Sequence, residues 1–152
     1  MDKKTLIIDH FECWGCKACE VACKQENNAP DGIKLIEIVE DGPRMAGEQP
    51  FFEYHVRVCR HCEDPPCVAE CPVAAITRRS DHMVILDTAE CTGCEACIDA
   101  CPYDAISFDE ANGVARKCNM CSSRVNQGLI PACADNICLA RCIQFTSTFD
   151  ST

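Results

Sequence analysis

Closely spaced cysteines constrain this chain more than any other feature of its sequence. Three runs share a nearly common spacing, and they are Cys13-x2-Cys16-x2-Cys19-x3-Cys23, Cys59-x2-Cys62-x4-Cys67-x3-Cys71 and Cys91-x2-Cys94-x2-Cys97-x3-Cys101. A looser group near the C-terminus consists of Cys118, Cys121, Cys133, Cys138 and Cys142. The recurring unit is thus a cysteine pattern, and the chain must fold so that these thiols meet suitable partners.

Metal-bound thiolates explain these cysteines better than disulfides do. The chain has 17 cysteines, which is an odd number, and we expect no export signal at its N-terminus. Aromatic residues make up only 6% of the 152 residues, so a conventional core of large side chains would be thin. We therefore expect one compact domain over residues 1–152 in which bound metal and sulfur fill much of the interior.

Charge and hydropathy exclude several classes of function. The formal net charge is -10, so there is no basic excess to displace the counterions of a nucleic acid. The longest apolar runs are far too short to span a bilayer, so we expect no direct membrane insertion. With no signal peptide expected, the predicted location is cytoplasmic.

The spacing of the runs favours [4Fe–4S] clusters. Three cysteines separated by two residues each can hold three corners of a cubane, and the fourth cysteine of such a run ligates a second cluster. On this rule Cys101 completes the set of Cys59, Cys62 and Cys67, and Cys71 completes the set of Cys91, Cys94 and Cys97. Zinc also binds paired C-x2-C motifs, so a zinc-binding structural module is the alternative of another class.

The segments between the runs predict short strands and helices. Alternating residues predict strands over 5–9, 34–39, 52–58, 83–87 and 105–109. Helical turns are expected over 18–25 and 95–100, and turns at 27–32 and 41–43. These short elements of both kinds predict an α+β fold.

Two kinds of residue inside the runs also bear on the expected sites. Gly15 and Gly93 lie between ligands, where positive φ would bring backbone N–H groups toward sulfur. His61 lies between Cys59 and Cys62, and its simplest interpretation is a solvated or capping loop residue. Tuning of the adjacent cluster by His61 is the other possibility.

The chain resembles the four-cluster ferredoxin-like electron-transfer subunits of molybdenum and tungsten pterin oxidoreductases, of the dimethyl sulfoxide reductase type. The resemblance rests on these motifs together with Lys117, Cys118, Cys121, Arg124, Gly128, Pro131 and Cys133. The resemblance runs from about residue 13 to residue 138. It implies two pseudo-symmetric bacterial-ferredoxin-like halves, with the second half (59–101) inserted within the first (1–58 plus 102–152). It also implies that Cys23 joins Cys118, Cys121 and Cys133.

The tail departs from the pattern of that family. Cys13, Cys16 and Cys19 need a fourth ligand, which the family places four residues after the third cysteine of the last motif; here that residue is Ile137. Either Cys138 is the ligand after a one-residue bulge, or Cys142 replaces it, or this cluster is absent. Four clusters would use 16 of the 17 cysteines, so three or four clusters are expected.

The short length suggests a narrower resemblance, to the small iron–sulfur subunits that accompany tungsten enzymes such as the tungsten-dependent benzoyl-CoA reductase of anaerobic bacteria. The expected function is non-catalytic. The chain would relay single electrons to or from a catalytic tungsten- or molybdenum-pterin subunit, with a soluble ferredoxin or further redox subunit as a second partner. A free-standing soluble polyferredoxin is the alternative within the same class.

Overall fold

The computed structural model describes residues 2–148, and it is built from short strands and helices joined by cysteine-rich loops. The strands are β1 (Lys3–Ile8), β2 (Ile36–Ala46), β3 (Gln49–Val58), β4 (Ile76–Arg78), β5 (Val84–Leu86), β6 (Ile106–Asp109), β7 (Val114–Lys117) and β8 (Ile143–Thr148). The α-helices are α1 (Ala18–Asn27), α2 (Pro66–Ala69), α3 (Ala96–Ala100) and α4 (Ser122–Val125), and a 3-10 turn covers His10–Glu12. The predicted mixture of α and β structure is confirmed.

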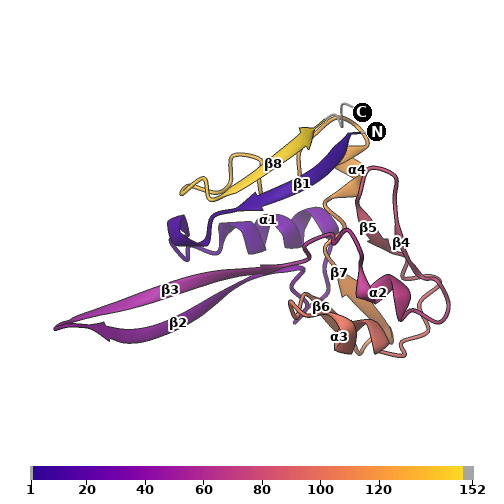
Figure 1. The fold of residues 1–152 in the computed structure, drawn as a ribbon, viewed down its shortest axis with the longest axis horizontal. Coiled ribbons are helices and arrows are strands. Elements are labelled where there is room, and N and C mark those ends of the chain that lie inside the picture. The colour runs from indigo at the N-terminus through magenta and orange to yellow at the C-terminus, as the bar shows by residue number, and fades with distance from the viewer. Residues whose placement is uncertain (1, 149–152) are drawn as a thin grey trace.

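Within the described residues the strands form four separate antiparallel pairs, β1 with β8, β2 with β3, β4 with β5 and β6 with β7. The β1–β8 pair joins the two ends of the described chain, so the N-terminal strand and the C-terminal strand lie side by side (Figure 1). Helix α1 lies between this pair and the β2–β3 hairpin (Figure 1). No described helix is long and apolar enough to cross a membrane.

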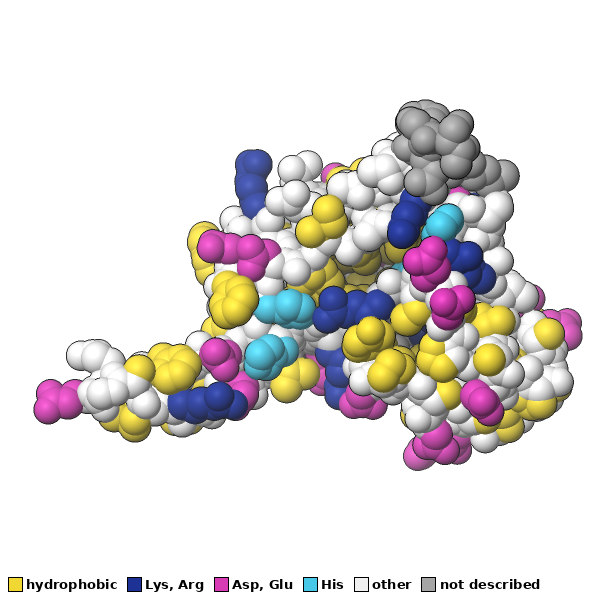
Figure 2. All heavy atoms as spheres, in the orientation of Figure 1, with side chains coloured by type: hydrophobic (Ala, Val, Ile, Leu, Met, Phe, Trp, Pro, Cys, Tyr) yellow, Lys and Arg dark blue, Asp and Glu magenta, His cyan; other side chains and the backbone are white. Residues whose placement is uncertain are grey.

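The β2–β3 hairpin is longer than the sequence predicts. Residues 41–43, predicted as a turn, instead lie within β2, where the register shifts between Asp41 and Arg44. This prediction is wrong because the two strands continue to pair beyond the irregularity, as far as Ala46 opposite Gln49. The hairpin therefore extends well outside the body of the molecule (Figure 1), with hydrophobic side chains along its exposed length (Figure 2).

The interior consists largely of sulfur and small aliphatic side chains. At the base of the β2–β3 hairpin, alternation places Ile36, Ile38, Val56 and Val58 on one buried face. This face packs with five buried cysteines, namely Cys19, Cys23, Cys118, Cys133 and Cys142. A second apolar cluster joins Cys67 and Cys97 to small residues of β4 to β7. The expectation that sulfur supplies much of the core is confirmed.

Candidate metal centres

The cysteines gather into four groups, which we call sites 1 to 4. Site 1 consists of Cys71, Cys91, Cys94 and Cys97. Site 2 consists of Cys59, Cys62, Cys67 and Cys101. Site 3 consists of Cys23, Cys118, Cys121 and Cys133. Site 4 consists of Cys13, Cys16, Cys19, Cys138 and Cys142. At sites 1, 2 and 4 the cysteines line a common small hollow.

The fourth cysteine of each run lies with the cysteines of a different run or of the tail, as the spacing predicts. Cys101 follows the third run but lies with the cysteines of the second, and Cys71 makes the opposite exchange. Cys23 likewise leaves its own run and lies with the tail cysteines. The structure thus brings together every predicted set of ligands, and it adds Cys142 to site 4 beside Cys138.

The first C-x2-C loop of each of the four cysteine groups uses the same backbone conformation before its second cysteine. Gly15 and Gly93 have φ of 69° and 72°, as predicted, and His61 and Met120 take the same region with φ of 46° and 54°. The N–H of His61 donates to Cys59 Sγ at 3.4 Å, and the N–H of Met120 donates to Cys118 Sγ at 3.3 Å. In these two loops a residue other than glycine takes the left-handed conformation and aims its backbone N–H at sulfur.

Gly93 gives a prediction with a matched control. A Cβ at Gly93 would lie 2.3 Å from the backbone oxygen of Gly113, whereas a Cβ at Gly113, which also has positive φ, meets nothing within 4 Å. Alanine at either position costs about 1–2 kcal/mol of backbone strain. Gly93→Ala adds an overlap of about 1–3 kcal/mol.

We expect Gly93→Ala to unfold at a clearly lower denaturant concentration than Gly113→Ala, measured by circular dichroism under anaerobic conditions. Equal midpoints for the two variants would contradict the close approach of Gly113 to the loop of site 1.

Burial raises the pKa of several free thiols. It raises the pKa of Cys19 and Cys118 to about 12, and the pKa of Cys23 and Cys97 to about 11. Burial also raises the pKa of Cys133. Bare thiolates are therefore disfavoured at neutral pH, and a metal that binds them must supply positive charge and displace their protons.

Polar hydrogens complete the surroundings of the thiols. Asn27 Nδ2 donates to Cys23 Sγ at 3.5 Å and lies 3.6 Å from Cys121 Sγ, so it joins two members of site 3. The N–H of Ala115 donates to Cys91 Sγ at 3.5 Å. Four thiols around a common hollow with N–H donors aimed at sulfur fit a cubane cluster, whose sulfur atoms accept hydrogen bonds. The sequence analysis did not identify Asn27.

His61 is buried rather than solvated, so the simplest interpretation of this residue was wrong. His61 is only 8% exposed, because the loop turns its ring inward against β5. There Nδ1 accepts a hydrogen bond from the N–H of Val84 at 2.9 Å. Burial, with the nearby Lys117 ammonium, lowers the pKa of His61 to about 3. The ring is therefore neutral, and its Nε2 has no hydrogen-bond partner among the described residues.

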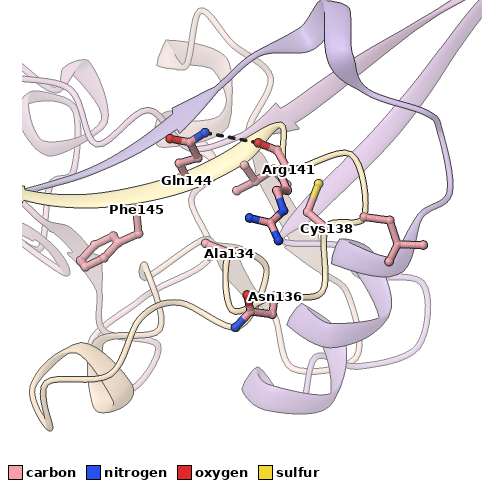
Figure 3. A pocket seen from close by; sticks show the side chains of 8 residues that line it. Ala134, Asn136, Cys138, Arg141, Gln144 and Phe145 are labelled. Atoms are coloured by element: carbon pink, nitrogen blue, oxygen red, sulfur yellow. Dashed lines mark hydrogen bonds between the residues drawn. The ribbon is translucent and has the colours of Figure 1, made fainter.

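The tail loop places Cys138 and Cys142 together. Their Sγ atoms lie 3.5 Å apart, and both line the hollow of site 4. Beside them a surface pocket of about 550 Å³ opens, and Figure 3 shows Cys138 and Arg141 on the loop that borders it. Site 4 therefore lies close to the surface, with one cysteine more than a cubane needs.

Comparison with known proteins identifies the family. Residues 50–148 match the family described as the 4Fe-4S dicluster domain. This chain therefore belongs to the 4Fe–4S dicluster family. Its cofactors are accordingly [4Fe–4S] clusters, and the zinc alternative is set aside.

Curated relatives agree with this family. The chain is 37% identical over 142 residues to the thiosulfate reductase electron transfer subunit PhsB of Salmonella typhi, covering 92% of this chain and 73% of that one. It is 35% identical over 150 residues to a chain of the polysulfide reductase of Wolinella succinogenes, covering 97% and 78%. It is 38% identical over 132 residues to a subunit of the tetrathionate reductase of Salmonella typhimurium, covering 86% and 53%. The chain thus spans between about half and three quarters of these relatives. Together with a chain of the anaerobic dimethyl sulfoxide reductase of Escherichia coli, they confirm the resemblance to the dimethyl sulfoxide reductase type.

Proposed function

We propose that this chain is an electron wire of four [4Fe–4S] clusters, one at each of sites 1 to 4. The observation that carries the proposal is the division of the cysteines into four sets, each drawn from at least two segments of the chain. The proposed ligands are Cys71, Cys91, Cys94 and Cys97; Cys59, Cys62, Cys67 and Cys101; Cys23, Cys118, Cys121 and Cys133; and Cys13, Cys16, Cys19 and Cys138. Each cluster, when bound, accepts and releases one electron.

Neighbouring thiols support an order from site 1 to site 4. Burial is the main cause of the raised thiol pKa values, and in three cases a thiol of a neighbouring site also contributes. Cys67 of site 2 raises the pKa of Cys97 in site 1, and Cys59 of site 2 raises that of Cys118 in site 3. Cys19 of site 4 does the same to Cys133 in site 3. The exposed cysteines are Cys94 in site 1 and Cys16 in site 4, so both ends of this order reach the surface.

Local geometry favours Cys138 over Cys142 as the fourth ligand of site 4. In the loop after Cys71, Ala74 has φ of 53° and its N–H donates to Cys71 O at 3.4 Å. In the tail loop, Arg141 has φ of 53° and its N–H donates to Cys138 O at 3.0 Å. Cys138 therefore stands where Cys71 stands, three residues before the left-handed residue.

When the tail loop is aligned with the loop after Cys71, Cys142 corresponds to Ala75. Ala75 O accepts from the N–H of Asp87 at 2.8 Å, and Cys142 O accepts from the N–H of Asp9 at 2.8 Å. Burial alone would raise the pKa of Cys138, but the N–H of Ile143, the Cys142 thiol and the N–H groups of Cys142 and Ala140 outweigh it and lower that pKa. Neighbouring N–H groups lower the pKa of Cys71 in the same way. Cys142 is therefore the spare thiol, a small buried side chain under the cluster.

A tight turn accommodates the extra residue in the tail. The N–H of Asn136 donates to Ala134 O at 3.0 Å, and Asn136 has φ of 56°. This turn supports the one-residue bulge among the alternatives, because it lets Cys138 rather than Ile137 reach site 4.

We further propose the arrangement into two pseudo-symmetric ferredoxin-like halves, with residues 59–101 inserted between 1–58 and 102–152. Matching contacts support it. Asp87 follows β5 four residues before Cys91 and accepts from the N–H of Ala89. Asp9 likewise follows β1 four residues before Cys13 and accepts from the N–H of Phe11. The β4–β5 pair and the β8–β1 pair therefore lead into their cysteine runs in the same way.

The proposed role is that of a non-catalytic subunit that passes electrons to or from a catalytic molybdenum- or tungsten-pterin subunit. The names of the relatives support it, since they denote an electron transfer subunit and component chains of reductases. A tungsten partner such as benzoyl-CoA reductase, a ferredoxin partner and a cytoplasmic location stay predictions. The free-standing polyferredoxin is the other candidate, because both ends of the wire are exposed.

Affinity purification from the native host tests this role. With a tag at either end of the chain, we expect a much larger polypeptide that contains pterin-bound molybdenum or tungsten to co-purify through size-exclusion chromatography, and metal analysis identifies which. Elution of the tagged chain alone, with all its iron, would favour the free polyferredoxin.

A further inference from the structure

Lys117 is a buried cation without a carboxylate. It ends β7 directly before Cys118 and is only 5% exposed. Its Nζ donates to Val84 O at 2.5 Å and to Cys118 O at 2.7 Å, and none of the ion pairs in residues 2–148 includes it. A buried ammonium held only by neutral carbonyls is costly, so negative charge must come from another group nearby.

The groups nearest to Lys117 belong to two cluster sites. Its side chain lines the hollow of site 2 together with the four thiols of that site. Its backbone continues into Cys118, whose carbonyl it binds, in site 3. The ammonium therefore lies at the junction between site 2 and site 3, in the middle of the proposed wire.

Two hydrogens at this junction point to a further acceptor. An ammonium has three N–H donors, and Lys117 has two carbonyl acceptors. His61 accepts from the N–H of Val84 through Nδ1, which places its own hydrogen on Nε2, and that buried atom has no partner among the described residues. Val84 thus holds both side chains, His61 through its N–H and Lys117 through its carbonyl. One hydrogen of the Lys117 ammonium and the Nε2 hydrogen of His61 therefore have no acceptor among the described residues.

We propose that Lys117 is the counter-cation shared by the clusters of sites 2 and 3, that His61 is a hydrogen-bond donor beside it, and that Lys117 raises the reduction potentials of this central pair. The inference rests on the proposed function, since it assumes clusters at both sites. Each added electron increases the negative charge next to a fixed positive charge in a medium of low dielectric constant. Lys117 therefore stabilises the reduced clusters more than the oxidised clusters. Lys117 acts as a positioning residue that transfers no electron itself.

The test is an anaerobic redox titration of the full cluster-loaded chain, followed by electron paramagnetic resonance. In Lys117→Met we expect the equilibrium constant for reduction of two of the four clusters to fall about tenfold, which is 59 mV for a one-electron couple. The reduction potentials of the clusters at sites 1 and 4 should change far less. Lys117→Arg should restore the potentials because it keeps the charge.

Lys24 offers a matched control. Its Nζ also donates to two backbone carbonyls, Pro30 O at 3.1 Å and Ile33 O at 3.2 Å, outside the cluster hollows. Lys24→Met removes the same charge and the same number of hydrogen bonds, and we expect it to leave all four potentials nearly unchanged. Unchanged potentials in Lys117→Met, or an equal shift of all four clusters, would overturn the proposal.

A second measurement uses the unaltered chain, in case Lys117→Met does not fold. With lysine labelled by ¹⁵N at Nζ, pulsed electron paramagnetic resonance of the reduced protein should detect weak ¹⁵N coupling that disappears in Lys117→Arg. Absence of that coupling in a chain with a full complement of iron would also overturn the proposal. The iron content separates the two hypotheses, since a chain without four clusters contradicts the proposed function before Lys117 is considered.

Discussion

Replacing Cys138 by alanine should abolish the cubane of site 4, whereas replacing Cys142 by alanine should leave it intact. The loop geometry places Cys138 in the position of Cys71 and Cys142 in the position of Ala75, so Cys142→Ala restores the side chain that the equivalent loop already has. The carbonyl of Cys142 also accepts from the N–H of Asp9, as the carbonyl of Ala75 accepts from the N–H of Asp87.

Iron analysis and electron paramagnetic resonance distinguish the two variants. In Cys138→Ala the iron content should fall by about one to about four atoms per chain, according to whether a three-iron remnant stays on the other three thiolates. The signal of one reduced [4Fe–4S] cluster should disappear. Cys142→Ala should keep all its iron and its spectrum. Loss of iron from Cys142→Ala with retention in Cys138→Ala would reverse the assignment, and retention in both would show that Cys138 is not a required ligand.

Replacing Cys101 should remove the cluster of site 2 and spare that of site 1, although Cys101 follows the run that supplies site 1. Cys101 lines the same hollow as Cys59, Cys62 and Cys67. Its thiol also contributes, after burial, to the shift in the pKa of Cys67. Without Cys101 one iron of that cubane has no protein ligand.

A comparison of four variants tests this exchange. The reduced spectrum of Cys101→Ala should lose the same signal as that of Cys62→Ala, and it should retain the signal that Cys94→Ala loses. Cys71→Ala should behave as Cys94→Ala does. If Cys101→Ala and Cys94→Ala lost the same signal, each run would hold its own cluster, and the crossed sets of sites 1 and 2 would be contradicted.

The sequence predicted the arrangement of the cysteines better than that of the strands. Cubane geometry fixes which thiols must meet, so spacing alone grouped Cys71 with the third run and Cys101 with the second. Strands β1, β3, β5 and β6 were predicted from their alternating residues, and so was the first part of β2, as the strand expected over 34–39. Strands β4 and β7 have only three and four residues, and β8 follows the tail cysteine loop, whose turns dominate the local pattern, so these strands were missed.

The residues that surround the thiols depend on tertiary contacts, and most were not predicted. His61 is buried because its loop folds against Val84, which is 23 positions away in the chain. Lys117 shares a strand face with the buried Ala115, an alternation that could have indicated an inward-facing lysine. Asp41 to Pro43 show the opposite error, since strong local turn residues were overridden by the pairing of β2 with β3.

Iron and acid-labile sulfide analysis of the anaerobically purified chain tests the central claim most directly. Four clusters require about 16 iron and about 16 sulfide per chain, with visible charge-transfer absorption and no stoichiometric zinc. About 12 of each would show that one of the four sites, most directly site 4, does not hold a cubane. A colourless protein containing zinc and no sulfide would contradict the whole account.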